Sequence, residues 1–357
     1  MQRRYHLQPA IFFASILLIT DLTAIRVKPQ SSPRSNRDSD PYQQQTNKSE
    51  KVEPDVVRVD TDLVNTLFTA VDKDHHFITN LRAEDIRIFE NGRQQEISLF
   101  ERETDRRLSI AVLVDTSESQ TGVLEDEKKA ALTFVNSVIR ADRDRAAILS
   151  FTGATRVEQD LTNEMEKLEN AVAVIKVQLS PENRERLEAG EPPLPVDEDP
   201  TGYTGVWDAL WIAIQKVLVK TPQPARRAII LLSDGDDTSS RVSKQEAMDL
   251  AVKSDVVVYA IGIRDSHFPY GKMDRKALRK VSEQTGGQVF FPTDDQGLRL
   301  AFSQIENELR SQYAIAYSPS DKTRDGTYRQ VKIEIVSPEM RKRKLRLLYR
   351  QGYYAKT

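Results

Sequence analysis

The stretch IAVLVDTSESQ, residues 110–120, is an apolar run followed by a polar run with one carboxylate and two serine hydroxyls at alternate positions. Asp115, Ser117 and Ser119 occupy alternate positions directly after the apolar residues. An uninterrupted apolar run of this length is typical of a strand that is buried on both faces of a sheet. The polar group at its end could cap the next helix, carry a nucleophile or hold a cation. The rest of the sequence has to decide among these three.

The composition restricts the classes of function. The chain has 357 residues, of which 39% are hydrophobic and 30% charged, as is typical of a globular protein. Its formal net charge is −2, whereas a general nucleic-acid-binding protein carries a basic excess. Cysteine is absent from the sequence. Disulfides, zinc–thiolate sites, iron–sulfur clusters and cysteine nucleophiles are therefore excluded.

The N-terminal segment, residues 1–24, predicts export. Arg3 and Arg4 precede an apolar run at about 10–20, which is the pattern of a secretory signal peptide. The run is short for a membrane span, which needs about 20 apolar residues. Ala24 fits the last residue before cleavage, but the position two residues earlier is not small. Both a cleaved signal peptide and an uncleaved anchor therefore stay open.

The next segment, residues 25–54, is rich in Ser, Gln, Asn, Pro and charge. Such a composition cannot bury enough apolar surface to order itself, so we expect a disordered linker. A signal followed by a linker predicts that the folded part is extracytoplasmic: periplasmic, secreted or membrane-anchored.

Both ends of the folded part have strand-like patterns. Residues 55–104 contain short apolar runs and the pair Asn91-Gly92, which is a strong hairpin signal. Residues 312–357 return to the same kind of pattern. Because about four strands rarely make a stable domain alone, we expect these two segments to build one β-sandwich together.

The segment between them, residues 105–311, alternates apolar strand-like runs with amphipathic helical runs. RRAIILLSD at 226–234, for example, is followed by SKQEAMDLAVKS at 243–254. This alternation predicts an α/β fold with a doubly wound, mostly parallel sheet covered by helices on both faces. We expect this domain to be inserted in the β-sandwich.

Ligands of doubly wound sheets bind at the carboxyl ends of the strands. Asp115, Ser117 and Ser119 end one predicted strand, Asp234 ends another, and Thr204 precedes a predicted helix. All five offer oxygen, the ligand atom that Mg²⁺ prefers. The set therefore predicts a metal site with two formal negative charges, at which a position left to water could accept a partner's carboxylate. Mn²⁺ and Ca²⁺ stay open as alternatives.

These residues, in this order and on these elements, resemble the metal-ion-dependent adhesion site of von Willebrand factor type A domains. The whole chain is similar to bacterial exported proteins that contain a domain related to this family. The resemblance implies that Ser117, Ser119 and Thr204 are direct ligands. It implies that Asp115 and Asp234 bind the ion directly or through water. A long acidic, Pro-rich insertion at 176–203 departs from the family pattern, and it could select partners or occlude the ion.

Other interpretations of these motifs are weaker. Helix capping by Asp115, Ser117 and Ser119 would not require matching residues on distant strands. A Ser117 nucleophile would need a base and an oxyanion hole, and the chain has four histidines and no G-x-S-x-G motif. Asp236 and Asp237 fit a solvated rim better than a calcium loop. The neighbouring histidines at 75 and 76 fit a solvated turn better than a metal pair.

Together these observations predict an exported, non-catalytic binding protein that captures a protein partner through a carboxylate on one Mg²⁺-type ion, in adhesion or envelope assembly. A structural scaffold of the envelope that works without metal is the alternative, and a hydrolase based on Ser117 is weaker still. The partner would be a protein with an exposed Asp or Glu, not a nucleic acid. The sequence leaves the oligomeric state open.

Overall fold

The computed structural model describes residues 63–191, 194, 203–222, 224–267 and 272–357. All of them lie in one unit that spans Val59–Thr357. The predicted signal peptide and linker lie outside the described residues. Within the described part of the chain, no helix combines the length and the apolar character that crossing a membrane requires.

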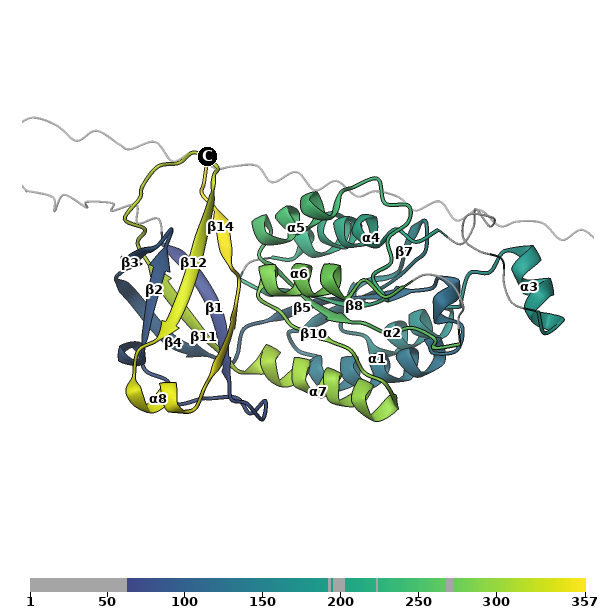
Figure 1. The fold of residues 1–357 in the computed structure, drawn as a ribbon, viewed down its shortest axis with the longest axis horizontal. Helices are drawn as coiled ribbons and strands as arrows, with labels where there is room; N and C mark the ends of the chain where they lie inside the picture. The colour runs from purple at the N-terminus through teal and green to yellow at the C-terminus, as the bar shows by residue number, and fades with distance from the viewer. Residues whose placement is uncertain (1–62, 192–193, 195–202, 223, 268–271) are drawn as a thin grey trace, which may run out of the picture. The chain divides into compact units, whose positions relative to one another are not determined.

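A six-stranded sheet forms the centre of the α/β part (Figure 1). Every neighbouring pair is parallel except β6 and β7, which are antiparallel. The predicted α/β fold with a mostly parallel, doubly wound sheet is therefore confirmed. In spatial order the strands are β10 (Val289–Phe290), β9 (Val256–Ile261), β8 (Arg226–Leu232), β5 (Leu108–Asp115), β6 (Arg145–Phe151) and β7 (Thr155–Thr162).

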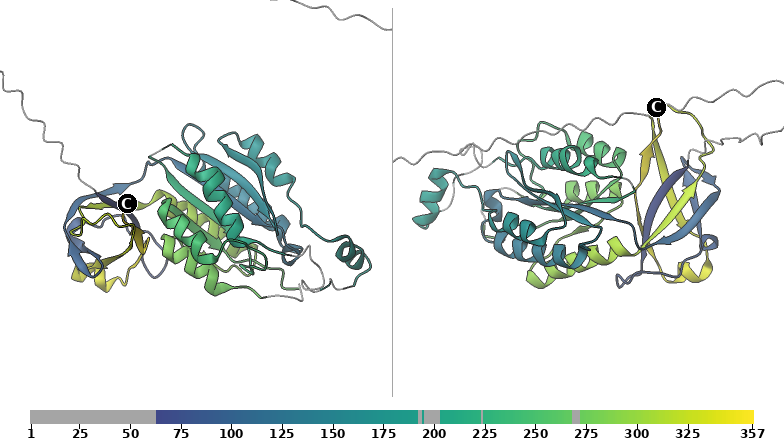
Figure 2. Two further views of the ribbon diagram at one scale, coloured as in Figure 1. Left: turned by 90° about the horizontal axis from the view of Figure 1, so that it is seen from above. Right: turned by 180° about the vertical axis from the view of Figure 1, so that it is seen from behind.

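Helices cover both faces of this sheet, as Figures 1 and 2 show. Alternate residues of β5 face opposite layers, because side chains of a strand point alternately to its two faces. Ile110, Val112 and Val114 join one apolar cluster, whereas Ala111 and Leu113 join the other. The first cluster contains residues of α1 (Leu124–Val138), α2 (Met165–Ala173) and α7 (Asp295–Arg310); the second contains residues of α4 (Val206–Ile212), α5 (Lys244–Lys253) and α6 (Arg275–Thr285).

Several short elements complete the description. The helix that starts as α4 continues through a π-helical turn, Ala213–Val217, and a 3-10 turn, Leu218–Lys220. The predicted insertion contains one described helix, α3 (Pro181–Glu188). The other short elements are η1 (Ala83–Asp85), η2 (Glu118–Gln120) and α8 (Pro338–Lys342).

Two four-stranded antiparallel sheets combine strands from both ends of the described chain (Figure 1). Apolar residues of both sheets belong to one cluster, which includes Phe68, Ile88, Tyr317 and Val331. The first sheet has the order β13 (Arg346–Tyr349), β1 (Val64–Val71), β11 (Gln312–Tyr317), β4 (Ile97–Glu103). The second has the order β14 (Gly352–Tyr354), β12 (Tyr328–Ile335), β2 (Ile86–Glu90), β3 (Arg93–Gln95).

The predicted hairpin joins β2 and β3. Asn91 and Gly92 have φ angles of 47° and 79°, as a type I′ turn requires, and only glycine and a few residues such as asparagine adopt such angles readily. The register pairs Glu90 with Arg93 directly across the turn. The local sequence signal therefore determined this connection.

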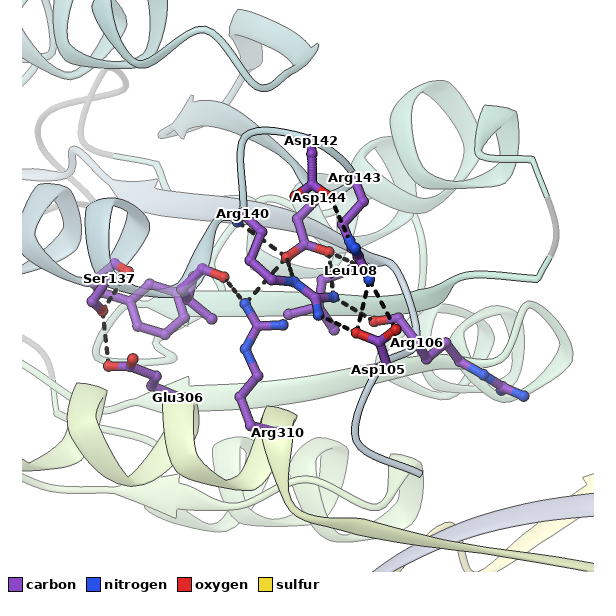
Figure 3. A network of polar contacts seen from close by, with 12 residues as sticks. Asp105, Arg106, Leu108, Ser137, Arg140, Asp142, Arg143, Asp144, Glu306 and Arg310 are labelled. Carbon is purple, nitrogen blue, oxygen red and sulfur yellow. Dashed lines mark hydrogen bonds and ion pairs between the residues drawn. The ribbon is translucent and has the colours of Figure 1, made fainter. Parts of the chain in front are cut away.

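The chain enters and leaves the α/β part at the amino ends of its strands, where a buried carboxylate holds the two connections (Figure 3). Asp144 precedes β6 and accepts hydrogen bonds from the backbone N–H of Leu108 at 2.8 Å and from Arg140 Nε at 2.8 Å. Arg310, at the end of α7, donates to the same carboxylate at 3.1 Å. Arg140 also pairs with Asp105, in the connection before β5, at 2.7 Å. This network therefore links the two chain segments that connect the α/β part to the two four-stranded sheets.

Candidate metal site

The first loop of the predicted site begins where β5 ends. The Asp115 side chain is fully buried. Its Oδ2 accepts a hydrogen bond from Ser233 Oγ at 2.6 Å, and its Oδ1 accepts one from the backbone N–H of Ser117 at 2.9 Å. Ser233 follows β8, so the ends of β5 and β8 meet at this carboxylate. The sheet therefore brings the two predicted acidic loops together.

The two serines of this loop lie side by side. Ser117 Oγ and Ser119 Oγ are 3.1 Å apart, and both side chains are buried. Neither caps the following helix: the N-cap of α1 is Val123, without a side-chain cap bond, and Ser117 makes no side-chain cap bond at the start of η2. The capping interpretation of these residues is therefore wrong. Two adjacent hydroxyl oxygens are instead available to a common ligand.

Asp234 lies on the same edge, directly after β8. Its carboxylate accepts a hydrogen bond from the backbone N–H of Asp236 at 3.0 Å, and the Ser119 hydroxyl lies near enough to act on the pKa of this carboxyl. Gly235 has a φ of +77°, and a Cβ there would lie 2.7 Å from Cγ of Leu278. A glycine is therefore required for the turn that directs Asp234 towards the serines.

Thr204 is held between the ends of β6 and β8 by its backbone. Its carbonyl oxygen accepts hydrogen bonds from the N–H groups of Thr238 and Ser239, at 2.9 and 3.1 Å. The N–H of Gly205, the next residue, donates to the carbonyl of Thr152 at 2.7 Å. Thr204 is buried, but no hydrogen bond among the described residues joins its side chain to the other four predicted ligands. Its position on this edge is fixed, whereas its role as a ligand stays a prediction.

Burial and mutual repulsion dominate the electrostatics of the two carboxyls. Burial and then the negative charge of Asp234 raise the pKa of Asp115 to about 7, against hydrogen bonds from Ser233 and Ser117. Burial likewise raises the pKa of Asp234, although the Asp236 N–H, the Ser119 hydroxyl and the charge of Arg264 act in the opposite direction. Two buried like charges beside two hydroxyl oxygens form an all-oxygen site of the kind that Mg²⁺ binds. The residues present therefore fit a divalent cation.

A basic residue that the sequence analysis did not identify also reaches this edge. Arg264 Nη1 lies 3.2 Å from Asp234 Oδ2, and both side chains are largely buried. Arg264 follows β9, so the same rule about strand ends would have found it. Its guanidinium already neutralises part of the negative charge at the site.

A buried carboxyl on α1 was also missed. Glu127 is fully buried on the face of α1 that carries Leu124, Ala130 and Phe134. Neither of its carboxylate oxygens has a hydrogen-bond partner among the described residues. Burial, followed by the charges of Asp115 and Asp234, raises its pKa well above the usual value. The helical spacing predicted that position 127 faces inward, but a charged residue there would ordinarily be assigned to the solvated face.

The insertion at 176–203 is attached to the metal loop. Asn183, in α3, donates from Nδ2 to both carboxylate oxygens of Glu118, at 2.9 and 2.8 Å. The N–H of Gln178 donates to the carbonyl of Thr116 at 2.8 Å. Asn183 and Glu118 are both buried. The insertion therefore contacts the residues that alternate with the proposed ligands, although most of its C-terminal half lies outside the described residues.

The sequence analysis assigned Asp236 and Asp237 to a solvated rim, and this assignment is wrong for Asp237. Asp237 Oδ1 accepts hydrogen bonds from the N–H of Val206 at 2.8 Å and from Ser240 Oγ at 2.5 Å. Asp237 thus satisfies a free N–H group at the start of α4, as a side chain from outside the helix can do. Asp236 is half-buried and receives one long hydrogen bond, 3.4 Å, from the N–H of Lys272.

A second acidic cluster lies in the turn after β1. Atoms of Asp72, Asp74 and His76 come within 4.8 Å of one another. Asp72 Oδ1 accepts the N–H groups of Asp74 and His76, both at 2.9 Å, so these hydrogen bonds account for the arrangement as a turn. His76 lies in this turn and His267 pairs with Asp265. Among the described residues, no imidazole forms a hydrogen bond with Ser117.

Part of the chain that forms this edge matches a known family. Residues 196–304 match the model of the von Willebrand factor type A domain. The matched residues include Thr204 and Asp234, whereas Asp115, Ser117 and Ser119 precede them. No curated protein matches the chain.

Several solved structures match the chain at low sequence identity. A von Willebrand factor type A protein from Catenulispora acidiphila has 13% identity and a TM-score of 0.45, over 83% of this chain and 74% of that one. BatB from Bacteroides thetaiotaomicron has 14% identity and a TM-score of 0.43, over 56% and 98%.

A third similar structure is a proximal thread matrix protein 1 from mussel byssus, with a zinc-occupied metal-ion-dependent adhesion motif. It has 16% identity and a TM-score of 0.47, over 62% of this chain and 50% of that one, so this chain spans about half of its length. The family match runs from the segment before Thr204 through β8 and β9 and into α7. The α/β part therefore contains a segment, residues 196–304, that matches the von Willebrand factor type A domain.

Proposed function

We propose that this protein binds a protein partner through a divalent cation held by Asp115, Ser117, Ser119, Thr204 and Asp234. The observation that supports this most is the convergence of two buried carboxylates and two adjacent hydroxyls on one edge of the sheet. Two buried acidic groups that repel each other are costly unless a cation compensates them. Mg²⁺ is our first choice, because every proposed ligand atom is oxygen.

A bound cation would supply an electrophilic position for an incoming carboxylate. Because Arg264 pairs with Asp234, these two carboxylates would compensate the charge of a bound ion only in part. An ion with incompletely compensated charge favours an additional anionic ligand. We therefore propose an exposed Asp or Glu of a protein as the group that is captured, in adhesion or envelope assembly, with no chemical step catalysed.

The two four-stranded sheets would carry the α/β domain in this role. We propose that they form one β-sandwich into which the α/β domain is inserted, because each sheet contains strands from before and after that domain. Together with the predicted signal and linker, this arrangement would present the binding edge away from an extracytoplasmic attachment point.

A metal-free scaffold is the second candidate, and one observation favours it. Arg264 already provides a positive charge 3.2 Å from Asp234. If this ion pair is the working state, the edge would be a structural cluster and the protein would bind its partners through other surfaces. The two proposals differ in whether a divalent cation changes the stability of the fold.

Thermal unfolding of the purified chain in EDTA, and then with Mg²⁺ or Mn²⁺, separates them. A ligand that binds only the folded state stabilises it by about 2.7 kcal/mol at 100 times its dissociation constant. We expect a rise in the unfolding temperature that Asp115→Ala and Ser117→Ala abolish. Ser109→Ala is the control, since Ser109 is a buried serine at the other end of the same strand. An unfolding temperature that no metal changes would support the scaffold.

The partner chemistry needs its own experiment. A peptide array in which every Asp or Glu is matched by Asn or Gln would be probed with the protein, with Mg²⁺ and with EDTA. We expect binding only to acidic members and only with the metal. Equal binding to the amide peptides would contradict the capture of a carboxylate.

A further inference from the structure

The first turn of α1 contains three consecutive acidic residues with different surroundings. Glu125 pairs with Lys128 at 2.8 Å and Asp126 pairs with Lys129 at 3.3 Å. Both of these acidic side chains are more than half exposed. Glu127 is fully buried, and no described residue forms a hydrogen bond with either of its carboxylate oxygens. Helical spacing explains why it faces inward, but it does not explain why a carboxyl group occupies the position.

A nearby residue also has a buried oxygen that accepts no hydrogen bond from the described residues. Gln120, at the end of η2, is fully buried. Its Nε2 donates to Ser119 Oγ at 3.2 Å and to the carbonyl of Ile263 at 3.3 Å, whereas its Oε1 accepts nothing from the described residues. Buried polar atoms in folded proteins nearly always have a partner, which can be water or an ion. Three buried oxygen acceptors, two on Glu127 and one on Gln120, therefore require donors that the described part of the polypeptide does not provide.

The position of Glu127 connects this deficit to the metal site. It lies in the first turn of the helix that follows the Asp115 loop, on the face that packs against β5. The negative charges of both Asp115 and Asp234 act on its carboxyl group. The peptide dipoles of α1 favour a carboxylate at this end of the helix. An acidic group here thus belongs to the same electrostatic environment as the two predicted acidic ligands.

We propose that Glu127 is a further residue of the metal site, whose carboxylate accepts hydrogen bonds from water on the cation and adds a third negative charge to it. This inference rests on the proposed function. The charge of Glu127 offsets that of the Arg264 guanidinium, which lies 3.2 Å from Asp234. The site thereby keeps an excess of negative charge for a divalent cation despite the arginine.

The test measures Mn²⁺ affinity by titration calorimetry and the unfolding temperature in EDTA, both on the full chain. Residues that support metal ligands typically change metal affinity by about 10- to 100-fold when substituted. We expect Glu127→Gln to weaken Mn²⁺ binding by at least about 10-fold, without lowering the unfolding temperature in EDTA. Glu125→Gln is the matched control, because it removes an exposed carboxylate from the same turn, and it should bind Mn²⁺ like the native chain.

The possible outcomes separate this inference from the proposed function. Equal Mn²⁺ affinity of Glu127→Gln and the native chain overturns the role of Glu127 and leaves the metal site intact. Absence of Mn²⁺ binding to the native chain overturns both. If Glu127→Gln shows no cooperative unfolding, Glu127→Asp decides. That variant keeps the charge and retracts it by one methylene, so Mn²⁺ affinity below that of the native chain supports the proposal, and native affinity contradicts it.

Discussion

Asp115 and Asp144 are both fully buried carboxylates. Asp115 lies at the carboxyl end of β5, and Asp144 directly precedes the amino end of β6, so the two lie at opposite ends of the strands of one sheet. Burial raises the pKa of Asp144, but hydrogen bonds from Arg140, Arg310 and two backbone N–H groups outweigh it, so its pKa lies below the usual value. Asp115 receives two hydrogen bonds and faces the negative charge of Asp234, and its pKa is raised to about 7. Burial alone therefore does not distinguish a structural carboxylate from a ligand.

The surrounding charges make the distinction. At the edge where the chain enters and leaves the α/β part, the polypeptide supplies the cations that Asp144 needs (Figure 3). At the opposite edge it supplies three acidic side chains and Arg264, so negative charge is in excess. The protein itself compensates the charge of Asp144, and we propose that a bound cation compensates the charges of Asp115 and Asp234. This contrast leads to predictions of decreasing size.

Substitution of Asp144 by Asn should have the largest effect. Removing one member of a buried ion pair costs about 3–5 kcal/mol, and we expect about 3 kcal/mol because Arg140 and Arg310 are partly exposed. Urea unfolding of the two chains measures the difference. Asp142→Asn is the control, since its side chain is 64% exposed, and it should change the free energy of unfolding by less than about 0.5 kcal/mol. Equal loss in both variants would contradict the structural role of Asp144.

The metal-free protein should become less stable as the pH rises towards neutrality. Asp115 has a folded-state pKa of about 7 against an ordinary value of 3.8. A group with a raised folded-state pKa stabilises the fold below its unfolded pKa and loses this contribution as the pH rises through the folded one. Between pH 5 and 7 the loss should be roughly 2 kcal/mol.

Chemical unfolding in EDTA across this pH range measures that loss. Asp115→Asn should reduce the dependence, because an amide does not titrate, whereas Asp234 and Glu127, whose pKa values are also raised, still do. Saturating Mg²⁺ should reverse it, since a cation favours the ionised carboxylates. A native chain in EDTA whose stability rises from pH 5 to 7 would show that Asp115 ionises as readily as an ordinary aspartate, and the contrast with Asp144 would disappear.

Loosening the insertion should have the smallest effect on the fold. Asn183→Ala removes the two hydrogen bonds to Glu118 and the one that Asn183 Oδ1 accepts from the N–H of Leu194. We expect a loss of about 1 kcal/mol, as is typical for buried hydrogen bonds. Limited proteolysis should show faster cleavage within 176–203. Glu185→Gln, which changes an exposed residue of the same helix, is the control, and equal cleavage of the two variants would show that Asn183 does not anchor the insertion.

The sequence predicted that the loops after β5 and β8 meet, because the signals of these loops are local. An apolar run predicts a buried strand, and the residue after it lies at the carboxyl edge of the sheet, so strand order and spacing were enough to place Asp115 and Asp234 near each other. The same rule, applied to β9, would have identified Arg264. Asp237 was misassigned because its role as a partner for α4 depends on a segment about thirty residues earlier in the chain.

By itself, then, the sequence determined the parallel sheet, the hairpin at Asn91-Gly92 and the meeting of the Asp115 and Asp234 loops, because strand and turn signals depend on neighbours along the chain. Tertiary structure alone decided which carboxylates receive cations from the protein. Asp144 gains Arg310 from α7, whereas Glu127 gains no hydrogen-bond partner from the described residues. Such pairings join residues far apart in sequence, and the burial that sets their energies exists only once the layers have packed.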